Sequence, residues 1–435
     1  MKNYNQFIEL LKKEVVPALG CTEPTAIAYA AAKAREVLGE MPEKVELTLS
    51  GNIIKNAMGV GIPGTGMKGS DIATAVGIVA GDASRKLEVL TDIPKEKVEE
   101  AKKLLENPNF ISMEIAQVPN KLYIKAKVIK GEKWASVEIK DFHTAITLIE
   151  KNGEIFFKAN CDEAIETISC APTVPTEDKS FMSVASIFDF AQNVDIKELE
   201  FLNKVIEVNG AIAEEGIKNP WGLEVGRTRL NNINSGMVGD TLETYSIAMT
   251  AAASDARMAG STLPVMTNSG SGNQGLTASV PVIAAAKKLN STSEDLLRAL
   301  ALSELIAIHM KSHLGRLSAL CGCVLASTGS SCGISYLLGG KLPEIEGTIK
   351  NILGNITGMF CDGAKPGCAL KIATGVSAGI QGALLAKDGI VIGSDEGIIS
   401  SSIEDTIRDA CAIGRDAMTE TDKMILEIMV NKSEK

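Results

Sequence analysis

Two cysteines with loop-forming residues between them are the first candidates for chemistry in this sequence. They stand in the segment Cys361-Asp362-Gly363-Ala364-Lys365-Pro366-Gly367-Cys368. Its glycines and proline favour a loop, which allows two thiolates separated by six residues to reach one cofactor. Lys365 adds a positive charge that favours the thiolate form. The segment therefore predicts that Cys361 and Cys368 bind a metal cofactor, although free cysteine is also a common buried residue.

The other cysteines of the C-terminal half do not follow a zinc pattern. Cys321, Cys323 and Cys332 lie in one uncharged segment. Neither cysteine pair has the C-x₂-C spacing of zinc ribbons and ferredoxins, and the chain has only three histidines, so a structural zinc site has little support. Simple burial is expected for the remaining cysteines, Cys161, Cys170, Cys332 and Cys411.

Cys21 stands in a turn between two expected helices and differs from these thiols in its position. The turn covers residues 17–23, and Pro24 fits the first turn of the helix that follows. Thr22 or Glu23 can cap this helix, which places the Cys21 sulfur at the positive end of the helix dipole. Such a position lowers the pKa of a thiol, as a general base or nucleophile requires. The alternative is that Cys21 is a small residue that fills the turn.

A glycine-rich loop over residues 267–275 precedes an expected helix over residues 276–287. Backbone N–H groups at the start of a helix bind anions, and the amide side chains of this loop can add to them. We therefore expect the loop to hold a substrate carboxylate, through Ser269, Gly270, Ser271 and Asn273. A plain flexible connection is the alternative.

His309 and His313 lie four residues apart near the end of a further expected helix. No glutamate stands between them as in the H-E-x-x-H zinc motif, so a substrate-facing role or a polar packing role is expected for His313. Arg316, next to the bend that follows, is expected to bind a carboxylate, because its guanidinium group matches that group. His143 is expected to be a surface or packing residue.

The secondary structure that must position these residues changes along the chain, from mixed strands and helices to helices alone. Alternating apolar residues at 45–49, 122–128 and 137–139 predict strands, and Asn152-Gly153 predicts a hairpin. Helices are expected at 71–79 and 95–105. Residues 43–175 therefore predict an α+β domain, which the linker-like stretch 171–178 ends.

The rest of the chain predicts a predominantly all-helical catalytic domain over residues 176–435. Its helices are rich in alanine and glycine, as at 239–258, 293–310 and 369–386, so their backbones can approach closely. Two more helices are expected at 5–16 and 24–38, and we expect residues 1–42 to pack on this catalytic domain. The predicted fold class is therefore α+β.

The composition of the chain limits the classes of molecule that it is expected to bind. The net charge of −10 and a pI of about 5.1 repel nucleic acid and anionic membrane surfaces, so a small molecule is the expected partner. No signal or transit peptide is recognised at the N-terminus, and the uncharged run 317–340 is too interrupted by polar residues for a membrane helix. A cytoplasmic location is expected, where nine cysteines stay reduced.

Four segments together resemble the L-cysteine desulfidase family, whose relatives are the iron–sulfur-dependent L-serine dehydratases. They are residues 17–24 (Pro-Ala-Leu-Gly-Cys-Thr-Glu-Pro), 317–323 (Leu-Ser-Ala-Leu-Cys-Gly-Cys), 354–359 (Gly-Asn-Ile-Thr-Gly-Met) and the segment 361–368 quoted above. The resemblance implies that Cys321, Cys361 and Cys368 hold one [4Fe–4S] cluster per subunit and that Cys21 accepts a proton. Cys323 competes with Cys321 for the first ligand position. Pyridoxal phosphate is not expected.

The activity that the resemblance implies is the conversion of L-cysteine to pyruvate, ammonia and hydrogen sulfide. The loop 269–273, with His313 or Arg316, would then hold the carboxylate and the ammonium group of the amino acid. Three alternatives stay open: a dehydratase acting on L-serine or a related hydroxy amino acid, a non-catalytic iron–sulfur sensor, and a zinc-stabilised structural protein. A homodimer is expected from the small-residue helices and the enzyme class.

Overall fold

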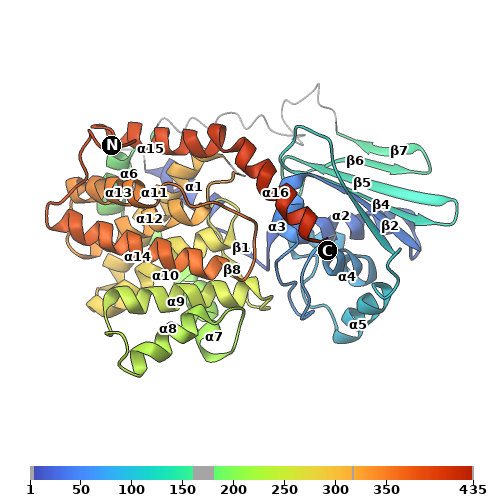
Figure 1. Cartoon of the computed structure of the whole chain (residues 1–435), viewed down its shortest axis with the longest axis horizontal. Helices are drawn as coiled ribbons and strands as arrows, with labels where there is room; N and C mark the ends of the chain where they lie inside the picture. Colours follow the sequence, from blue (N-terminus) through green and yellow to red (C-terminus); the bar gives the residue numbers. More distant parts are fainter. Residues whose placement is uncertain (1–3, 160–180, 316–317, 434–435) are drawn as a thin grey trace.

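The computed structural model describes residues 4–159, 181–315 and 318–433. Figure 1 shows two parts, one built from helices and one built around a six-stranded sheet. The predicted fold class, an α+β part followed by a predominantly helical part, is therefore confirmed. The linker predicted at 171–178 lies outside the described residues.

The sheet has the strand order β3-β2-β4-β5-β6-β7, with β2 and β3 parallel and the other neighbours antiparallel. The predicted alternation holds in β2, where Val45, Leu47 and Leu49 are buried. The predicted hairpin joins β6 and β7 through Asn152 and Gly153, which both have positive φ. The strands are β2 (Lys44–Leu49), β3 (Ile111–Ile115), β4 (Tyr123–Lys130), β5 (Lys133–Lys140), β6 (Ile146–Lys151) and β7 (Glu154–Lys158).

Helices pack against this sheet and share its apolar core. The helices α2 and α4 approach closely, because a Cβ at Gly77 on α4 would lie 2.6 Å from the carbonyl oxygen of Ala28 on α2. The alanine-rich α2 in turn packs on β4 and β5. The helices of this part are α2 (Thr22–Leu38), α3 (Gly51–Ala57), α4 (Ser70–Ala80), the short η1 (Ala83–Glu88) and α5 (Lys95–Leu104).

The helical part is built around α11, whose apolar residues meet those of α1, α6, α12, α13 and α15. Close approach again depends on glycine, since a Cβ at Gly329 on α12 would lie 2.4 Å from the carbonyl oxygen of Ser303 on α11. The helices are α1 (Asn5–Glu14), α6 (Val184–Asn193), η3 (Ile196–Leu202), α7 (Asn203–Lys218), α8 (Val225–Asn234), α9 (Leu242–Met258), α10 (Gly272–Leu289), α11 (Ser293–Leu314), α12 (Gly322–Leu337), α13 (Leu342–Ile356), α14 (Cys368–Lys387), α15 (Ile403–Ala412), η4 (Ile413–Ala417) and α16 (Thr419–Ser433).

The two N-terminal helices go to different parts. Helix α1 packs against α11, as predicted. Helix α2 packs on the sheet, so the prediction that both N-terminal helices pack on the helical part is wrong for α2. The physical reason is that α2 is buried along most of its length and its alanines fit flat against β4 and β5. The exact domain boundaries at residues 42 and 175 stay predictions.

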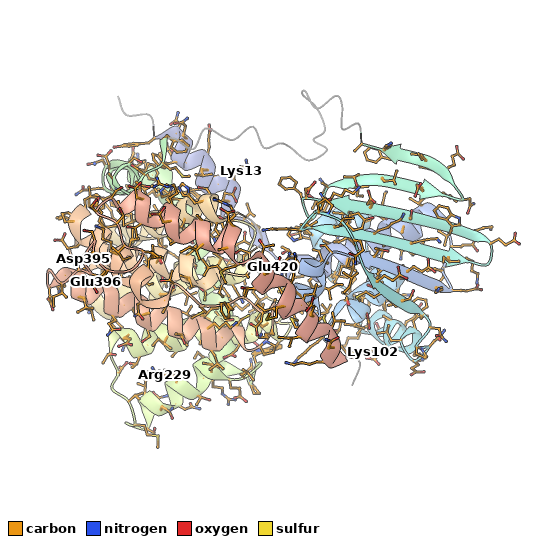
Figure 2. The ribbon with its side chains drawn as sticks, turned by 45° about the horizontal axis from the view of Figure 1, so that its top comes forward. Lys13, Lys102, Arg229, Asp395, Glu396 and Glu420 are labelled. Atoms are coloured by element: carbon orange, nitrogen blue, oxygen red, sulfur yellow. The ribbon has the colours of Figure 1, made fainter. Side chains whose placement is uncertain are left out.

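The last helix, α16, crosses from the helical part to α3 of the sheet part (Figure 1), and Figure 2 shows Glu420, in its first turn, between the two parts. Leu426 of α16 packs against the apolar core of the sheet part. Buried Lys55 of α3 pairs with Asp422 of α16 at 2.5 Å and donates to the carbonyl oxygen of Cys361 at 3.3 Å. This ion pair therefore ties both parts to the predicted ligand segment.

Three short features were not predicted, namely one helix, one strand and one pair of two-residue strands. Helix α3 and strand β3 carry too few residues for a clear periodic pattern. The two-residue strands β1 (Pro17–Ala18) and β8 (Val265–Met266) pair across the helical part. All three depend on contacts between distant segments, which local patterns do not report.

One described helix, α14, is long and apolar enough to cross a membrane. Half of its apolar window is buried, and it packs against α9, α12 and α13. A core helix has the same composition, so this single helix is weak evidence for a membrane span.

Candidate active site

A cavity of about 380 Å³ is lined by residues from both parts and contains most of the side chains predicted to do chemistry. Its wall includes Cys21, Cys321, Cys361 and Cys368. All four members of the predicted carboxylate loop also line it, namely Ser269, Gly270, Ser271 and Asn273. The fold thus brings together residues from the start, the middle and the end of the chain.

A short backbone pairing holds Cys321 and Cys361 side by side. The Cys321 N–H donates to the carbonyl oxygen of Met359 at 2.9 Å, and the Cys361 N–H donates to that of Ala319 at 2.6 Å. These bonds flank an antiparallel bridge between the two segments. The two thiols hydrogen-bond to each other as a result.

The predicted loop between Cys361 and Cys368 is present, and Cys368 is the first residue of α14. Gly363 has a φ of +89°, and a Cβ there would lie 2.0 Å from the carbonyl oxygen of Lys55, so this position requires glycine. Burial raises the pKa of the Cys368 thiol, and the charge of Lys365 opposes that effect. Lys365 itself pairs with Asp362.

Cys323 lies beside Cys321 and also lines the cavity. Its Sγ lies 3.2 Å from the Cys321 Sγ and 3.3 Å from the sulfur of Met359, either of which can accept its S–H. Cys321 hydrogen-bonds to Cys361 and is partly exposed, whereas Cys323 is buried. This arrangement favours Cys321 as the first ligand, and the choice between the two stays a proposal.

The chemistry of this thiol set fits an iron–sulfur cluster. Among the described residues, no three His, Cys, Asp or Glu side chains are grouped so that they could hold one metal ion. The thiolates of a cluster bind different iron atoms and surround it, so they need not meet at a single point. Cys321, Cys361 and Cys368 line one cavity in this manner.

Cys21 reaches the cavity through the pairing of β1 with β8. The Thr267 N–H donates to the carbonyl oxygen of Val16 at 2.8 Å, which joins the N-terminal segment to the glycine-rich loop. Cys21 is the N-cap residue of α2 and packs against Cys368. The thiol predicted to accept a proton therefore lies next to the predicted ligands.

The pKa of the Cys21 thiol differs from the prediction. Burial raises it to about 12, while the charge and hydrogen bond of Arg257 lower it and the charge of Glu23 raises it. The expected lowering at the helix N-terminus is therefore wrong for the net shift, because the loss of hydration outweighs the dipole and the arginine. Position, rather than acidity, supports a role for Cys21.

The glycine-rich loop is a tight turn that a buried glutamate holds from behind. Ser269 and Gly270 have positive φ, and the backbones of Asn268 and Ser271 exchange hydrogen bonds of 3.1 and 3.0 Å. The Asn268 amide donates to Oε2 of Glu304 at 2.6 Å. Glu304 is fully buried, which raises its pKa to about 8. The loop that lines the cavity is therefore fixed from the core.

Arg257, in the last turn of α9, is the main cavity residue that sequence reasoning missed. Its side chain is 6% exposed. Nη1 donates to Oδ1 of Asn273 at 3.1 Å and Nη2 to the carbonyl oxygen of Gly20 at 2.9 Å, while Nε has no partner among the described residues. A Cβ at Gly272 would lie 2.3 Å from this Nε. A buried guanidinium whose described hydrogen bonds reach two neutral oxygens and the Cys21 thiol, with no carboxylate among them, suits an anionic ligand.

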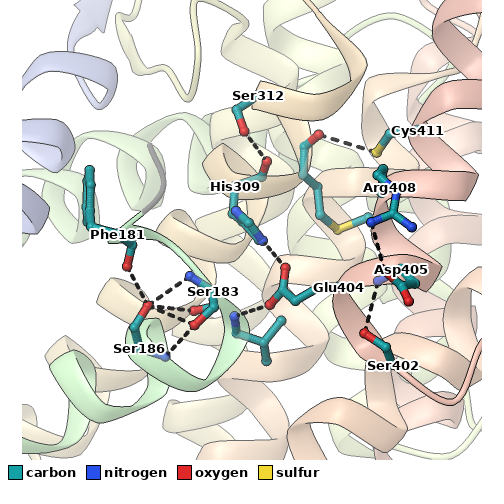
Figure 3. Close-up of polar contacts among 12 residues, drawn as sticks. Phe181, Ser183, Ser186, His309, Ser312, Ser402, Glu404, Asp405, Arg408 and Cys411 are labelled. Carbon is teal, nitrogen blue, oxygen red and sulfur yellow. Dashed lines mark hydrogen bonds and ion pairs between the residues drawn. The ribbon is translucent and has the colours of Figure 1, made fainter. Parts of the chain in front are cut away.

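The cavity does not include His313. Its ring lies 5.0 Å from that of His309, whose Nε2 bonds Oε2 of Glu404 at 2.7 Å (Figure 3). A polar packing role, the second expected possibility, fits this position. Arg316 lies outside the described residues. His143 does line the cavity, although a surface or packing role was expected.

Four helices begin at the cavity. Cys21 caps α2, Ser271 caps α10, Cys321 caps α12, and Cys368 is the first residue of α14. Helix N-termini carry partial positive charge and free N–H groups, which stabilise anions. The cavity therefore suits thiolates and a carboxylate-bearing ligand.

Comparison with known proteins covers both parts of the chain. The model of the family described as serine dehydratase alpha chain matches residues 84–427, which include Cys321, Cys361 and Cys368 and begin after Cys21. A UPF0597 protein of Oleidesulfovibrio alaskensis is 45% identical over 429 residues, which are 99% of this chain and 98% of that protein. A UPF0597 protein of Lachnoclostridium phytofermentans is 46% identical over 430 residues, covering 98% and 100% of the two chains.

Proposed function

Because this chain belongs to the serine dehydratase alpha-chain family of iron–sulfur-dependent enzymes, we propose that it is a [4Fe–4S]-dependent lyase that converts L-cysteine and water to pyruvate, ammonia and hydrogen sulfide. One observation carries the proposal. Cys321, Cys361 and Cys368 line one cavity with Cys21, which comes from a different segment. Family membership supports the lyase class and the cofactor, and L-cysteine as the substrate is the added step.

The three thiolates of the helical part would hold the cluster. Bound in this way, the cluster supplies a Lewis-acidic iron to the leaving group of the substrate. Lys371 holds the backbone on both sides of Cys361, because it donates to the carbonyl oxygen of Phe360 and pairs with Asp362. The ligand segment is thus fixed independently of the cofactor.

The carboxylate of the substrate would bind to Arg257 and to the loop 269–273. The guanidinium group already contacts Asn273, which lies in the first turn of α10, at the positive end of that helix. Together they would fix the acid end of a small amino acid and so orient its α-carbon.

The thiolate form of Cys21, which the positive charge of Arg257 favours, would accept the α-proton of the bound amino acid at its sulfur. The carbon–sulfur bond of L-cysteine then breaks, and sulfide leaves. The aminoacrylate that remains hydrolyses to pyruvate and ammonia. The proposal also places the enzyme in the cytoplasm, where reducing conditions would keep the seven described cysteines free.

The family description favours a second candidate, elimination of water from L-serine. Both substrates give pyruvate, and only L-cysteine gives sulfide. Anaerobic assays of protein with a full cluster should show sulfide and pyruvate in equal amounts from L-cysteine. Pyruvate from L-serine with no sulfide from L-cysteine would replace the desulfidase with the dehydratase.

The Cys21→Ser variant tests the base. We expect it to lose turnover and to keep the visible absorption and iron content of the cluster, because Cys21 is not among the three proposed ligands. A cluster-loaded variant with full activity would contradict the role of Cys21. A wild-type protein that holds the cluster and turns over neither amino acid would instead support the sensor.

A further inference from the structure

The two parts of the protein bring unlike charges to the cavity. Among the described residues that line the cavity, the helical part contributes only cations, Arg257, Lys311, Lys371 and Arg415. Both carboxylates, Glu23 and Asp141, come from the sheet part, which also contributes Lys121. A free amino acid carries one charge of each sign, on groups that are bonded to the same carbon. The distribution of charge therefore matches a zwitterion that spans the two parts.

Glu23 is the carboxylate that lies near Cys21. It stands two residues later, in the first turn of the helix that Cys21 caps. Glu23 and Cys21 line the same cavity as Arg257, which donates to the carbonyl oxygen of Gly20, the residue before Cys21. Asp141 lies in the turn after β5 and accepts a hydrogen bond from Asn120 at 2.8 Å.

The Glu23 carboxylate is oriented by neutral donors. The Thr22 hydroxyl donates to Oε2 at 3.1 Å, and the Asn56 amide donates to Oε1 at 3.2 Å. The side chain of Glu23 is only 13% exposed, and its ion-pair partner among the described residues is His143, at 4.0 Å. A largely buried carboxylate that makes no ion pair with a lysine or arginine of the described residues is costly unless a cationic ligand completes the site.

We infer that Glu23 binds the α-ammonium group of the substrate, while Arg257 binds its carboxylate. This inference rests on the proposed function, because it takes the ligand to be a small α-amino acid. The ammonium nitrogen is bonded to the carbon whose proton Cys21 accepts, so the group that binds the nitrogen must lie close to that sulfur. Glu23 meets this condition, and the site consequently selects amino acids over the corresponding acids that lack the amino group.

The test compares ligands that differ only at the α-position. L-Cysteine is paired with 3-mercaptopropanoate and L-serine with 3-hydroxypropanoate, and KM or the inhibition constant is measured anaerobically on cluster-loaded protein. We expect Glu23→Gln to reduce the preference for the amino acid by about 10- to 150-fold, as a charge-assisted hydrogen bond of about 1.5–3 kcal/mol predicts. The loss should fall on the amino acid, with the deamino acid little changed.

Asp141→Asn is the matched control, because it removes a carboxylate from the same wall of the cavity. It should keep the preference of the wild-type protein. If Glu23 only stabilises the start of α2, then Glu23→Gln should weaken the binding of both ligands of a pair equally. An unchanged preference in Glu23→Gln, or an equal loss in Asp141→Asn, would overturn the inference.

The ammonium site can be tested even if the proposed lyase activity is not found. If the wild-type protein turns over neither amino acid, the same ligand pairs are compared by their effect on its thermal unfolding. A larger stabilisation by the amino acid that Glu23→Gln removes would support the ammonium site without the lyase activity. Equal stabilisation by both members of a pair would contradict the ammonium site.

Discussion

Helix α11 separates two polar regions that have similar kinds of residue and different surroundings. Lys311, Leu314 and Gly315, at its C-terminal end, line the cavity. His309 and His313 contribute to the other region, which we call the histidine cluster and define as His309, His313 and Glu404. Figure 3 shows His309 and Glu404. The spacing of four residues did place both histidines together, at a site outside the cavity.

The two regions differ in what their charged groups face. In the histidine cluster, Oε1 of Glu404 accepts from the Val184 N–H at 2.7 Å and Oε2 bonds Nε2 of His309 at 2.7 Å, so one carboxylate joins α6, α11 and α15. In the cavity, Arg257 has a buried Nε without a described partner, beside about 380 Å³ of open volume. Buried ionisable groups that meet one another hold helices together, whereas those that face a cavity can bind a ligand.

The sharpest test of this comparison replaces a cysteine that lines the cavity and, as a control, a cysteine near the histidine cluster. Cys361→Ser or Cys368→Ser should abolish most of the visible absorption and iron content, because each removes one of three proposed ligands. Cys411→Ser should leave both unchanged, since the Cys411 thiol is buried and donates to the carbonyl oxygen of Met310 on α11 at 3.3 Å. Iron and sulfide analysis of anaerobically reconstituted proteins measures the difference. Equal iron in all three variants would remove the ligand assignment.

The next largest effect is expected from a comparison of two arginine variants, one in the cavity and one near the histidine cluster. Arg257→Lys should lower kcat/KM for the amino acid by about 10- to 150-fold, because a lysine in this buried site loses the forked contact, worth about 1.5–3 kcal/mol. Arg408→Lys is the control near the histidine cluster, where Arg408 is largely exposed and pairs with Asp405. Steady-state kinetics at matched cluster content compares them. A similar fall in both variants would mean that Arg257 has no special part in binding.

Glu304 of α11 provides a pH test. Its pKa is raised from 4.5 to about 8 by burial, so between these values the unfolded chain loses a proton that the folded chain keeps. Its contribution to the free energy of unfolding therefore falls as pH rises through this window, with a slope of up to ~1.4 kcal/mol per pH unit. Urea unfolding at several pH values should show a shallower decline in Glu304→Gln than in the wild-type protein. Parallel curves would show that Glu304 does not titrate in this range.

Sequence patterns predicted the features of the site that depend on residues adjacent in the sequence. The loop before Cys368 follows from its glycines and proline, and the place of Cys21 just before a helix follows from the residues after it. The prediction that Thr22 or Glu23 caps this helix is wrong, because the helix begins at Thr22 and Cys21 is its N-cap residue. The carboxylate loop was recognisable because Ser271 and the glycines around it precede a helix. Each of these features is local, and local propensity decides it.

The rest depended on contacts between distant segments. Arg257 lies in the last turn of an alanine-rich helix, where sequence alone indicates an ordinary capping charge, and its burial follows from the packing of Gly20 and Gly272 around it. The pKa of Cys21 followed burial, which no pattern of residues near the turn reports. The place of His313 was decided by which face of α11 packs on α15, and a spacing of four residues cannot distinguish the faces.

The smallest effect on activity is expected in the histidine cluster. Glu404→Gln keeps the size of the side chain and weakens its charge-assisted bonds to His309 and to the Val184 N–H, so the free energy of unfolding should fall by ~1 kcal/mol. KM, kcat and iron content should stay at wild-type values, because neither Glu404 nor His309 lines the cavity. Unfolding curves and kinetics on the same preparation test both statements. A tenfold change in KM with unchanged stability would show that the histidine cluster acts on the ligand through α11, and the division between the two sides of this helix would then fail.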